Sequence, residues 1–164
     1  MVFGFISLSF YTIVHVIISL VAIVTGLIAA VDMTAGKPLG IWNTVFLWTT
    51  IATSVTGFGF PFGGITPGIV VGVISLAILA VALFALYGQH LAGPWRWVYV
   101  VSAIAALELN VFVLIVQSFQ KIAFLQTLAP TQSEPPFQIV QGAALVLFVV
   151  LAVLAVRKFR PIAA

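Results

Sequence analysis

The feature that most constrains this chain is a series of five long apolar stretches that carry almost no charge. A membrane-spanning helix needs about 20 such residues, and only helices and closed barrels satisfy every backbone polar group in lipid. The period-two alternation of barrel strands is absent from these stretches. The sequence therefore predicts an all-α bundle of transmembrane helices, with spans at residues 5–31, 42–62, 66–87, 97–117 and 137–156.

The composition supports this class of protein. Hydrophobic residues make up 63% of the chain and charged residues 5%, whereas soluble domains carry about 25% charged residues. The length of 164 residues suits one bundle, so we expect a single transmembrane domain over residues 1–164. Cysteine is absent, which excludes a disulfide framework and a cysteine metal site. The net charge of +3 comes from few residues, and we expect no nucleic-acid partner.

The basic residues set the expected orientation in the membrane. Arg157, Lys158 and Arg160 follow the last apolar stretch. Lys37 and Arg96 fall on the same side if five helices alternate in direction. Because Lys and Arg are enriched in cytoplasmic loops, we expect a cytoplasmic C-terminus and an N-terminus on the outer side.

Glu108 lies inside the fourth apolar stretch, where a charged carboxylate costs about 2.5–3.5 kcal/mol. Counted from the outer ends of their stretches, Glu108 and His15 fall at similar depths, roughly 13 and 15 Å at about 1.5 Å per residue. Either the two side chains pair across the bundle, or a neutral Glu108 forms hydrogen bonds within it. Thr12, His15 and Ser19 share a helix face with small residues, which favours His15 facing protein. Glu108, His15, Ser19 and Thr12 together form the candidate intramembrane polar site.

Three further polar residues are expected to serve helix packing. Asn110 lies two residues after Glu108, about 200° around a helix, and therefore faces a different neighbour. It shares a stripe with Gln117, which is typical of a face closed by interhelical hydrogen bonds. Thr53 belongs to a cluster of hydroxyl residues in the second stretch, and such hydroxyls can bond back to carbonyls of their own helix.

Two connecting segments are distinctive. Residues 56–64 alternate phenylalanine with glycine and include Pro61. We expect this segment to end the second helix early and fold back, either as an aromatic anchor or as a lid over a lipid-soluble ligand. Residues 118–130 carry apolar side chains at helical spacing, so they either extend the fourth helix or lie along the outer surface.

The stretches FGFPFGG, LNVFVLIVQSFQK and LAPTQSEPPF resemble segments of a group of small bacterial inner-membrane proteins of uncharacterised activity. The likeness covers most of the chain from the second apolar stretch onward. The resemblance implies a bacterial source and a location in the cytoplasmic membrane. It implies no activity and no functional residues.

The polar inventory favours a non-catalytic role. No H-E-x-x-H motif, glycine-rich phosphate loop or Ser-His-Asp arrangement appears, and Asp32, Glu108 and Glu134 fall at different depths. A haem held by histidines is not expected within one chain, because His90 lies about a membrane leaflet from His15. The sequence best fits a structural, accessory or hydrophobic-ligand-binding protein, assembled with copies of itself or a larger membrane complex. The alternatives are a small proton-linked transporter or channel using Glu108 and His15, and a haem- or quinone-associated subunit.

Overall fold

The computed structural model describes residues 7–61, 63–64 and 66–160. Every regular element within these ranges is a helix, which confirms the predicted all-α class. In chain order the helices are α1 (Leu8–Thr34), α2 (Ile41–Gly57), α3 (Pro67–Leu83), the π-helical turn η1 (Phe84–Gly88), α4 (Trp95–Lys121), the short α5 (Ala123–Leu128) and α6 (Pro135–Lys158).

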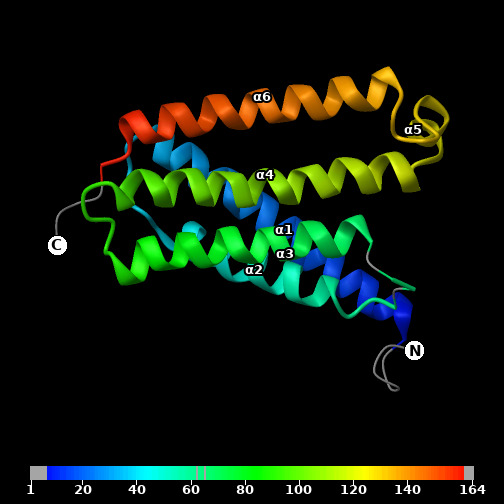
Figure 1. Ribbon diagram of the computed structural model, residues 1–164, viewed down its shortest axis with the longest axis horizontal. Coiled ribbons are helices and arrows are strands. Elements are labelled where there is room, and N and C mark those ends of the chain that lie inside the picture. The colour runs from blue at the N-terminus through cyan, green and yellow to red at the C-terminus, as the bar shows by residue number, and fades with distance from the viewer. Residues whose placement is uncertain (1–6, 62, 65, 161–164) are drawn as a thin grey trace.

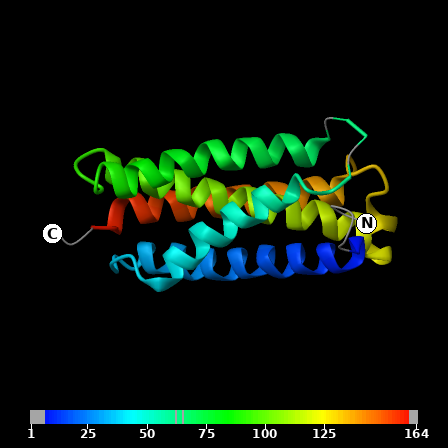
Figure 2. The ribbon, with the colours of Figure 1, turned by 90° about the horizontal axis from the view of Figure 1, so that it is seen from below.

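The long helices run back and forth along one axis, so that the two chain ends lie at opposite ends of the bundle (Figure 1). Helix α4 is central and contacts α3, α6 and α1. Helix α2 crosses obliquely from α1 to α3 (Figure 2). We call the end that holds the C-terminus, with the basic residues Arg157, Lys158 and Arg160, the basic end. The opposite end, where α2 connects to α3 and α4 connects to α6, is the open end.

Four of the helices are long and apolar enough to cross a membrane: α1, α3 continued by η1, α4 and α6. Helix α2 has 17 residues, or about 26 Å at about 1.5 Å per residue. The hydrocarbon core of a bilayer is about 30 Å thick. Four of the five predicted spans therefore meet the length requirement, and the second falls short of it.

The helix ends differ from the predicted spans by a few residues. The predicted end of the second span, Phe62, lies outside the described residues, and α2 already ends at Gly57. Glycine and proline follow this point, and both disfavour a continuing helix. The predicted start of the first span, Phe5, also lies outside the described residues, and α1 begins at Leu8. Helix α4 runs on to Lys121, beyond the predicted end at Gln117.

Residues 118–130 combine the two arrangements expected for them. Their first part extends α4 to Lys121. The backbone becomes extended at Ile122 (φ −91°, ψ 113°), which breaks the helix before the short α5 begins. Phe124 on α5 is 70% exposed. An exposed aromatic side chain at the end of a membrane bundle is typical of an interfacial anchor.

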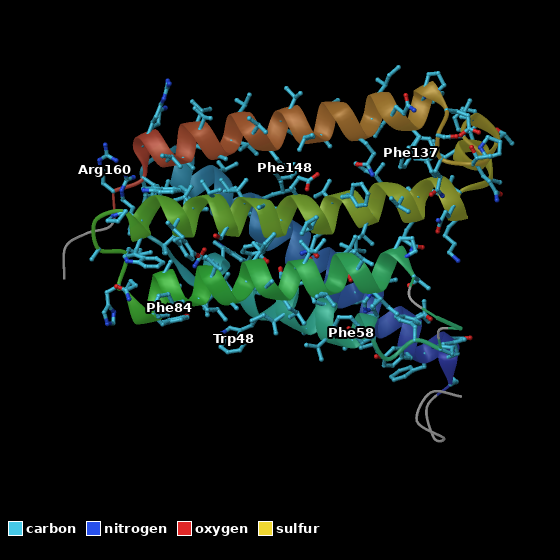
Figure 3. All side chains as sticks on the ribbon, viewed as in Figure 1. Trp48, Phe58, Phe84, Phe137, Phe148 and Arg160 are labelled. Atoms are coloured by element: carbon cyan, nitrogen blue, oxygen red, sulfur yellow. The ribbon has the colours of Figure 1, made fainter. Side chains whose placement is uncertain are left out.

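Side chains are packed most closely in the half of the bundle toward the basic end, which we call the packed half. Gly26 of α1 is buried there, and a Cβ atom at this position would lie 2.6 Å from Leu107 Cδ1 and 2.7 Å from the Phe46 ring. Figure 3 shows Phe148 between α6 and α4. Arg96 fastens the end of α6, because its Nη1 donates to the carbonyls of Val156 (2.8 Å) and Phe159 (2.6 Å).

Candidate functional site: a cavity in the open half

The half of the bundle toward the open end, here called the open half, contains a cavity of about 840 Å³ between α1, α2, α3 and α4. Its walls are mainly apolar. The apolar and glycine lining residues are Leu8, Val16, Leu20, Ile23, Gly57, Phe60, Pro61, Gly68, Val71, Gly72, Leu109, Val113 and Leu114. The polar lining residues are Thr12, His15, Ser19, Thr53, Ser54, Ser75, Asn110, Gln117 and Lys121.

The cavity is long and runs along the bundle axis. Its lining extends along α1 from Leu8 to Ile23 and along α4 from Lys121 back to Leu109. The fifteen helical steps from Leu8 to Ile23 correspond to about 22 Å at about 1.5 Å per residue. Lys121, the one charged residue in the described part of the lining, lies at the open end. The cavity therefore has a mouth at the open end and a floor near the middle of the bundle.

One side of the cavity is open between α1 and α4. Val16 and Leu20 of α1 line the cavity but are also 45% and 44% exposed, and Leu114 of α4 is 38% exposed. All three are apolar side chains on helices long enough to cross a membrane.

The segment after α2 forms part of the cavity wall. The Phe60 ring packs edge-on against His15 and Tyr11, with both pairs of ring centroids 5.1 Å apart. The Tyr11 hydroxyl donates to the carbonyl of Thr56 at 2.6 Å. The same hydroxyl occupies the space that a side chain at Gly59 would need. Helix α2 thus ends at Gly57, and Gly59 and Phe60 of the following segment pack against α1.

His15 lies on this wall with a defined hydrogen bond. Its Nδ1 is 2.8 Å from Thr56 Oγ1, while Thr56 Oγ1 is also 2.7 Å from the carbonyl of Ala52. A carbonyl oxygen only accepts, so the single Thr56 hydroxyl proton points to Ala52. Thr56 Oγ1 must then accept from His15, which places the ring proton on Nδ1. By this hydrogen-bond assignment, Nε2 of a neutral His15 carries a lone pair.

The hydroxyl groups of the other two α1 candidates, Thr12 and Ser19, already donate hydrogen bonds to backbone carbonyls. Thr12 Oγ1 donates to the carbonyl of Leu8 (2.8 Å), and Ser19 Oγ donates to the carbonyl of His15 (2.7 Å). Both residues line the cavity beside His15. The structure thus places Thr12, His15 and Ser19 together on one face, as their helical spacing predicts. The hydroxyls of Thr12 and Ser19 thus donate their protons within the protein, whereas the Nε2 lone pair of His15 is not used in this way.

At the floor of the cavity lie hydroxyl groups that form no hydrogen bond within the described part of the chain. Thr53 Oγ1 is buried without a hydrogen-bond partner. Ser54 and Ser75 are also buried lining residues, 7% and 3% exposed. Neither of their hydroxyls forms a hydrogen bond within the described ranges 7–61, 63–64 and 66–160. Unpaired buried polar groups are rare in folded proteins and need an explanation.

Asn110 and Gln117 lie on the α4 wall. The Asn110 Nδ2 donates to Thr50 Oγ1 of α2 at 3.1 Å, and both residues are buried. This is the interhelical hydrogen bond expected of a packing residue, although Asn110 also borders the cavity floor. Gln117 lies toward the mouth and is exposed. Thr53, expected to bond back to its own helix, does not do so within the part of the chain described.

Glu108 lies outside the cavity. It shares a helix face with Phe112, one turn on, whose carbonyl accepts from Gln141 Nε2 of α6 at 3.2 Å. The structure does not bring Glu108 to His15: no hydrogen bond or ion pair joins them among the described residues. This corrects the expected pair. From the observed helix ends, Glu108 lies about 20 Å and His15 about 10 Å deep at about 1.5 Å per residue.

No group of three or more His, Asp or Glu side chains that could hold a metal ion occurs in the part of the chain that the structure describes. His90 follows η1 in the connection before α4 at the basic end, with a positive φ of 50°. It therefore lies at the opposite end from the His15 wall. The two histidines cannot ligate one group within this chain.

Comparisons of the chain with protein-family models, with curated proteins and with solved structures found no match. The cavity and its side chains are therefore the basis for assigning a function.

Proposed function

We propose that this chain is a multi-pass protein of the bacterial cytoplasmic membrane whose cavity binds a lipid-soluble ligand taken from the bilayer. The observation that carries the proposal is the cavity of about 840 Å³, which has mainly apolar walls and an open side between two long apolar helices. Ligand sites are typically concave, mostly apolar and equipped with a few polar groups that orient the ligand. The cavity has each of these properties.

In this proposal α2 is the fifth span, shortened where the segment after Gly57 folds back. The C-terminus lies in the cytoplasm and the N-terminus on the outer side. The position of Arg157, Lys158 and Arg160 at the basic end supports this orientation, because basic residues are enriched in cytoplasmic loops. The cavity mouth at the open end then faces the outer side of the membrane.

The cavity also bears on two other interpretations, assembly with a partner and proton-linked transport. Helices α1 to α4 of a single chain enclose it, so ligand binding requires neither a second copy nor a larger membrane complex. Proton-linked transport through Glu108 and His15 loses its main argument, since Glu108 lies on the α6 side of α4 while His15 lies on the cavity wall. Ligand binding is therefore the function that the arrangement supports best.

The proposal is tested by filling the cavity. Val71 of α3 and Val113 of α4 both line it, and the double variant V71F/V113F places two rings inside. The matched control is V73F/V101F on the same two helices, where the valines are 56% and 42% exposed and do not line the cavity. The lipid bound per protein after purification in mild detergent is extracted and quantified by mass spectrometry.

We expect the wild type and V73F/V101F to retain a bound lipid at a fixed ratio to protein. V71F/V113F should retain several-fold less, because the added rings occupy the space of the ligand. Equal amounts of lipid in all three proteins, or no lipid with the wild type, would contradict the proposal.

A further inference from the structure

We infer that the ligand is an uncharged lipid bearing a hydroxyl group, which donates its hydrogen bond to Nε2 of His15. This inference rests on the proposed function, since it names the chemistry of the molecule that the cavity takes. A long-chain primary alcohol is the simplest member of the class.

The first argument is the direction of the hydrogen bond at His15. The contact of Thr56 Oγ1 with the Ala52 carbonyl fixes the proton of that hydroxyl, and the proton of His15 is consequently on Nδ1. Nε2 of the neutral ring is therefore an acceptor. The Phe60 ring packs edge-on against the imidazole, which lines the cavity wall. A ligand that forms a hydrogen bond here must bring a donor.

The second argument is the set of unused hydroxyls deeper in the cavity. Thr53, one turn before Gly57, and the floor residues Ser54 and Ser75 lack hydrogen-bond partners within the described part of the chain. A hydroxyl group both donates and accepts, so these side chains can bond to the oxygen lone pairs of a ligand head group. An alcohol satisfies the His15 acceptor with its proton and can accept from a neighbouring hydroxyl with its oxygen.

The third argument concerns charge. Among the described lining residues Lys121 has the single charged side chain, and it lies at the mouth. An ionised carboxylate or phosphate at the level of His15 would have no cation beside it, and burying an unpaired charge is costly. A ketone, ester or quinone has no donor, so its oxygen and the Nε2 lone pair would face each other. A neutral head group with a hydroxyl donor meets both requirements.

The test compares two probes that differ in one donor. Hexadecanol has a hydroxyl, and hexadecyl methyl ether has the same chain with the proton replaced. Binding of each to delipidated protein in detergent is measured by native mass spectrometry. For the wild type we expect hexadecanol to bind roughly twofold to tenfold more tightly, the range that one net hydrogen bond supplies.

The variant His15→Asn isolates the acceptor. An asparagine amide can occupy the position of Nδ1 and still donate to Thr56, but it has no atom at the position of Nε2. We expect H15N to bind both probes equally, with ether affinity as in the wild type. The matched control is Thr25→Val on the same helix, outside the cavity lining, whose hydroxyl donates to the carbonyl of Val21 (2.7 Å), and it should keep the preference.

A second variant tests the same hydrogen bond in case H15N does not fold. Thr56→Val removes the acceptor that fixes the proton on Nδ1, so His15 can exchange tautomers, and the preference for the alcohol should fall. Melting temperatures identify which variants are folded.

Each outcome bears on one proposal. Equal wild-type affinities for the two probes, or a preference that survives in both H15N and T56V, would overturn the assignment to His15 while leaving the cavity as a ligand site. A wild type that binds neither probe and retains only bulk phospholipid would also overturn it. A wild type that binds no lipid of any kind would remove the proposed function itself.

Discussion

The packed half and the open half of this bundle are built from the same helices, yet one is filled and the other is hollow. In the packed half, small residues of α1 let α2 and α4 approach closely, and large side chains such as Phe46 and Leu107 are almost completely buried. In the open half, the same helices separate around a cavity of about 840 Å³. Apolar composition therefore does not decide whether a membrane bundle packs or encloses space.

Two glycines show what does decide it. A side-chain carbon at Gly26 would lie under 3 Å from Leu107 and Phe46. The absence of a side chain at this position therefore allows the helices to pack closely. At Gly68, on α3 beside the cavity mouth, the nearest atom is Thr66 Oγ1 of its own helix start at 3.7 Å. Among the described residues no neighbouring helix comes within 4 Å of that position, and the glycine leaves room at the cavity instead. The same residue type brings helices together or leaves room, depending on what faces it.

The largest effect that we expect comes from exchanging these glycines for alanine. Gly26→Ala forces a methyl group against two buried side chains, and such overpacking typically costs about 1–3 kcal/mol. Gly68→Ala meets nothing closer than van der Waals contact and should be neutral or slightly stabilising. Thermal unfolding of the two variants in the same detergent measures the difference.

A fall in melting temperature for G26A with none for G68A would support the contrast between halves. Equal losses would show that the open half is as tightly packed as the other, and that the space beside α3 is filled in solution.

A smaller effect separates two tyrosines that each donate a hydrogen bond between helices. In the packed half, Tyr99 Oη donates to Asn43 Oδ1 at 2.6 Å and both residues are buried. In the open half, Tyr11 Oη donates to the Thr56 carbonyl at 2.6 Å in a partly buried setting. Interhelical hydrogen bonds in membranes average about 0.6 kcal/mol and reach about 1.7.

We expect Tyr99→Phe to cost about 1 kcal/mol, near the upper part of this range, because the buried Asn43 oxygen loses its donor. Tyr11→Phe should cost less, since the Thr56 carbonyl also accepts from the backbone N–H of Gly59 at 3.0 Å. Unfolding free energies of the two phenylalanine variants give the comparison. A larger cost at Tyr11 would assign the greater share of stability to the open half.

The two halves also differ in how far the sequence predicts them. Apolar length alone identifies the helices, and helical spacing places Thr12, His15 and Ser19 on one face. The pair of Glu108 with His15 is not predictable, because depth depends on helix ends that shift by a few residues. A shift of four residues at the end of α4, from Gln117 to Lys121, moves the reference by about 6 Å.

The cavity itself has no sequence signature of its own. Its lining comes from four helices that are distant in sequence, α1 to α4, and from Phe60 and Pro61 after the early end of α2 at Gly57. The partner of His15 could have been suspected, because Thr56 lies in the hydroxyl-rich part of the second stretch. Which hydroxyl on α2 meets the ring depends on the tilt of that helix, and the pattern of polar residues does not determine a tilt.

The smallest expected effect lies at the open end, in the turn before α6. Glu134 precedes the helix, and its carboxylate accepts from the Thr131 side chain (2.8 Å) and from the backbone N–H groups of Thr131 and Ser133 (3.1 Å each). Desolvation acts to raise the pKa of Glu134, but these hydrogen bonds together outweigh it and hold the pKa below its ordinary value. Hydrogen bonding to the charged form of a carboxyl favours that form.

A lowered pKa in the folded state means that the ionised carboxylate stabilises the turn above the ordinary glutamate pKa, and that this contribution is lost as pH falls through the lowered value. We expect the amide proton shifts of Thr131 and Ser133 to titrate together in detergent micelles, with a midpoint below that of an unstructured glutamate. Glu134→Gln should abolish the titration, and amides around Tyr99 in the packed half should not respond in either protein. A midpoint at or above the ordinary glutamate value would mean that these hydrogen bonds are not formed in solution. The ordered structure at the open end would then reach only to the last turn of α4.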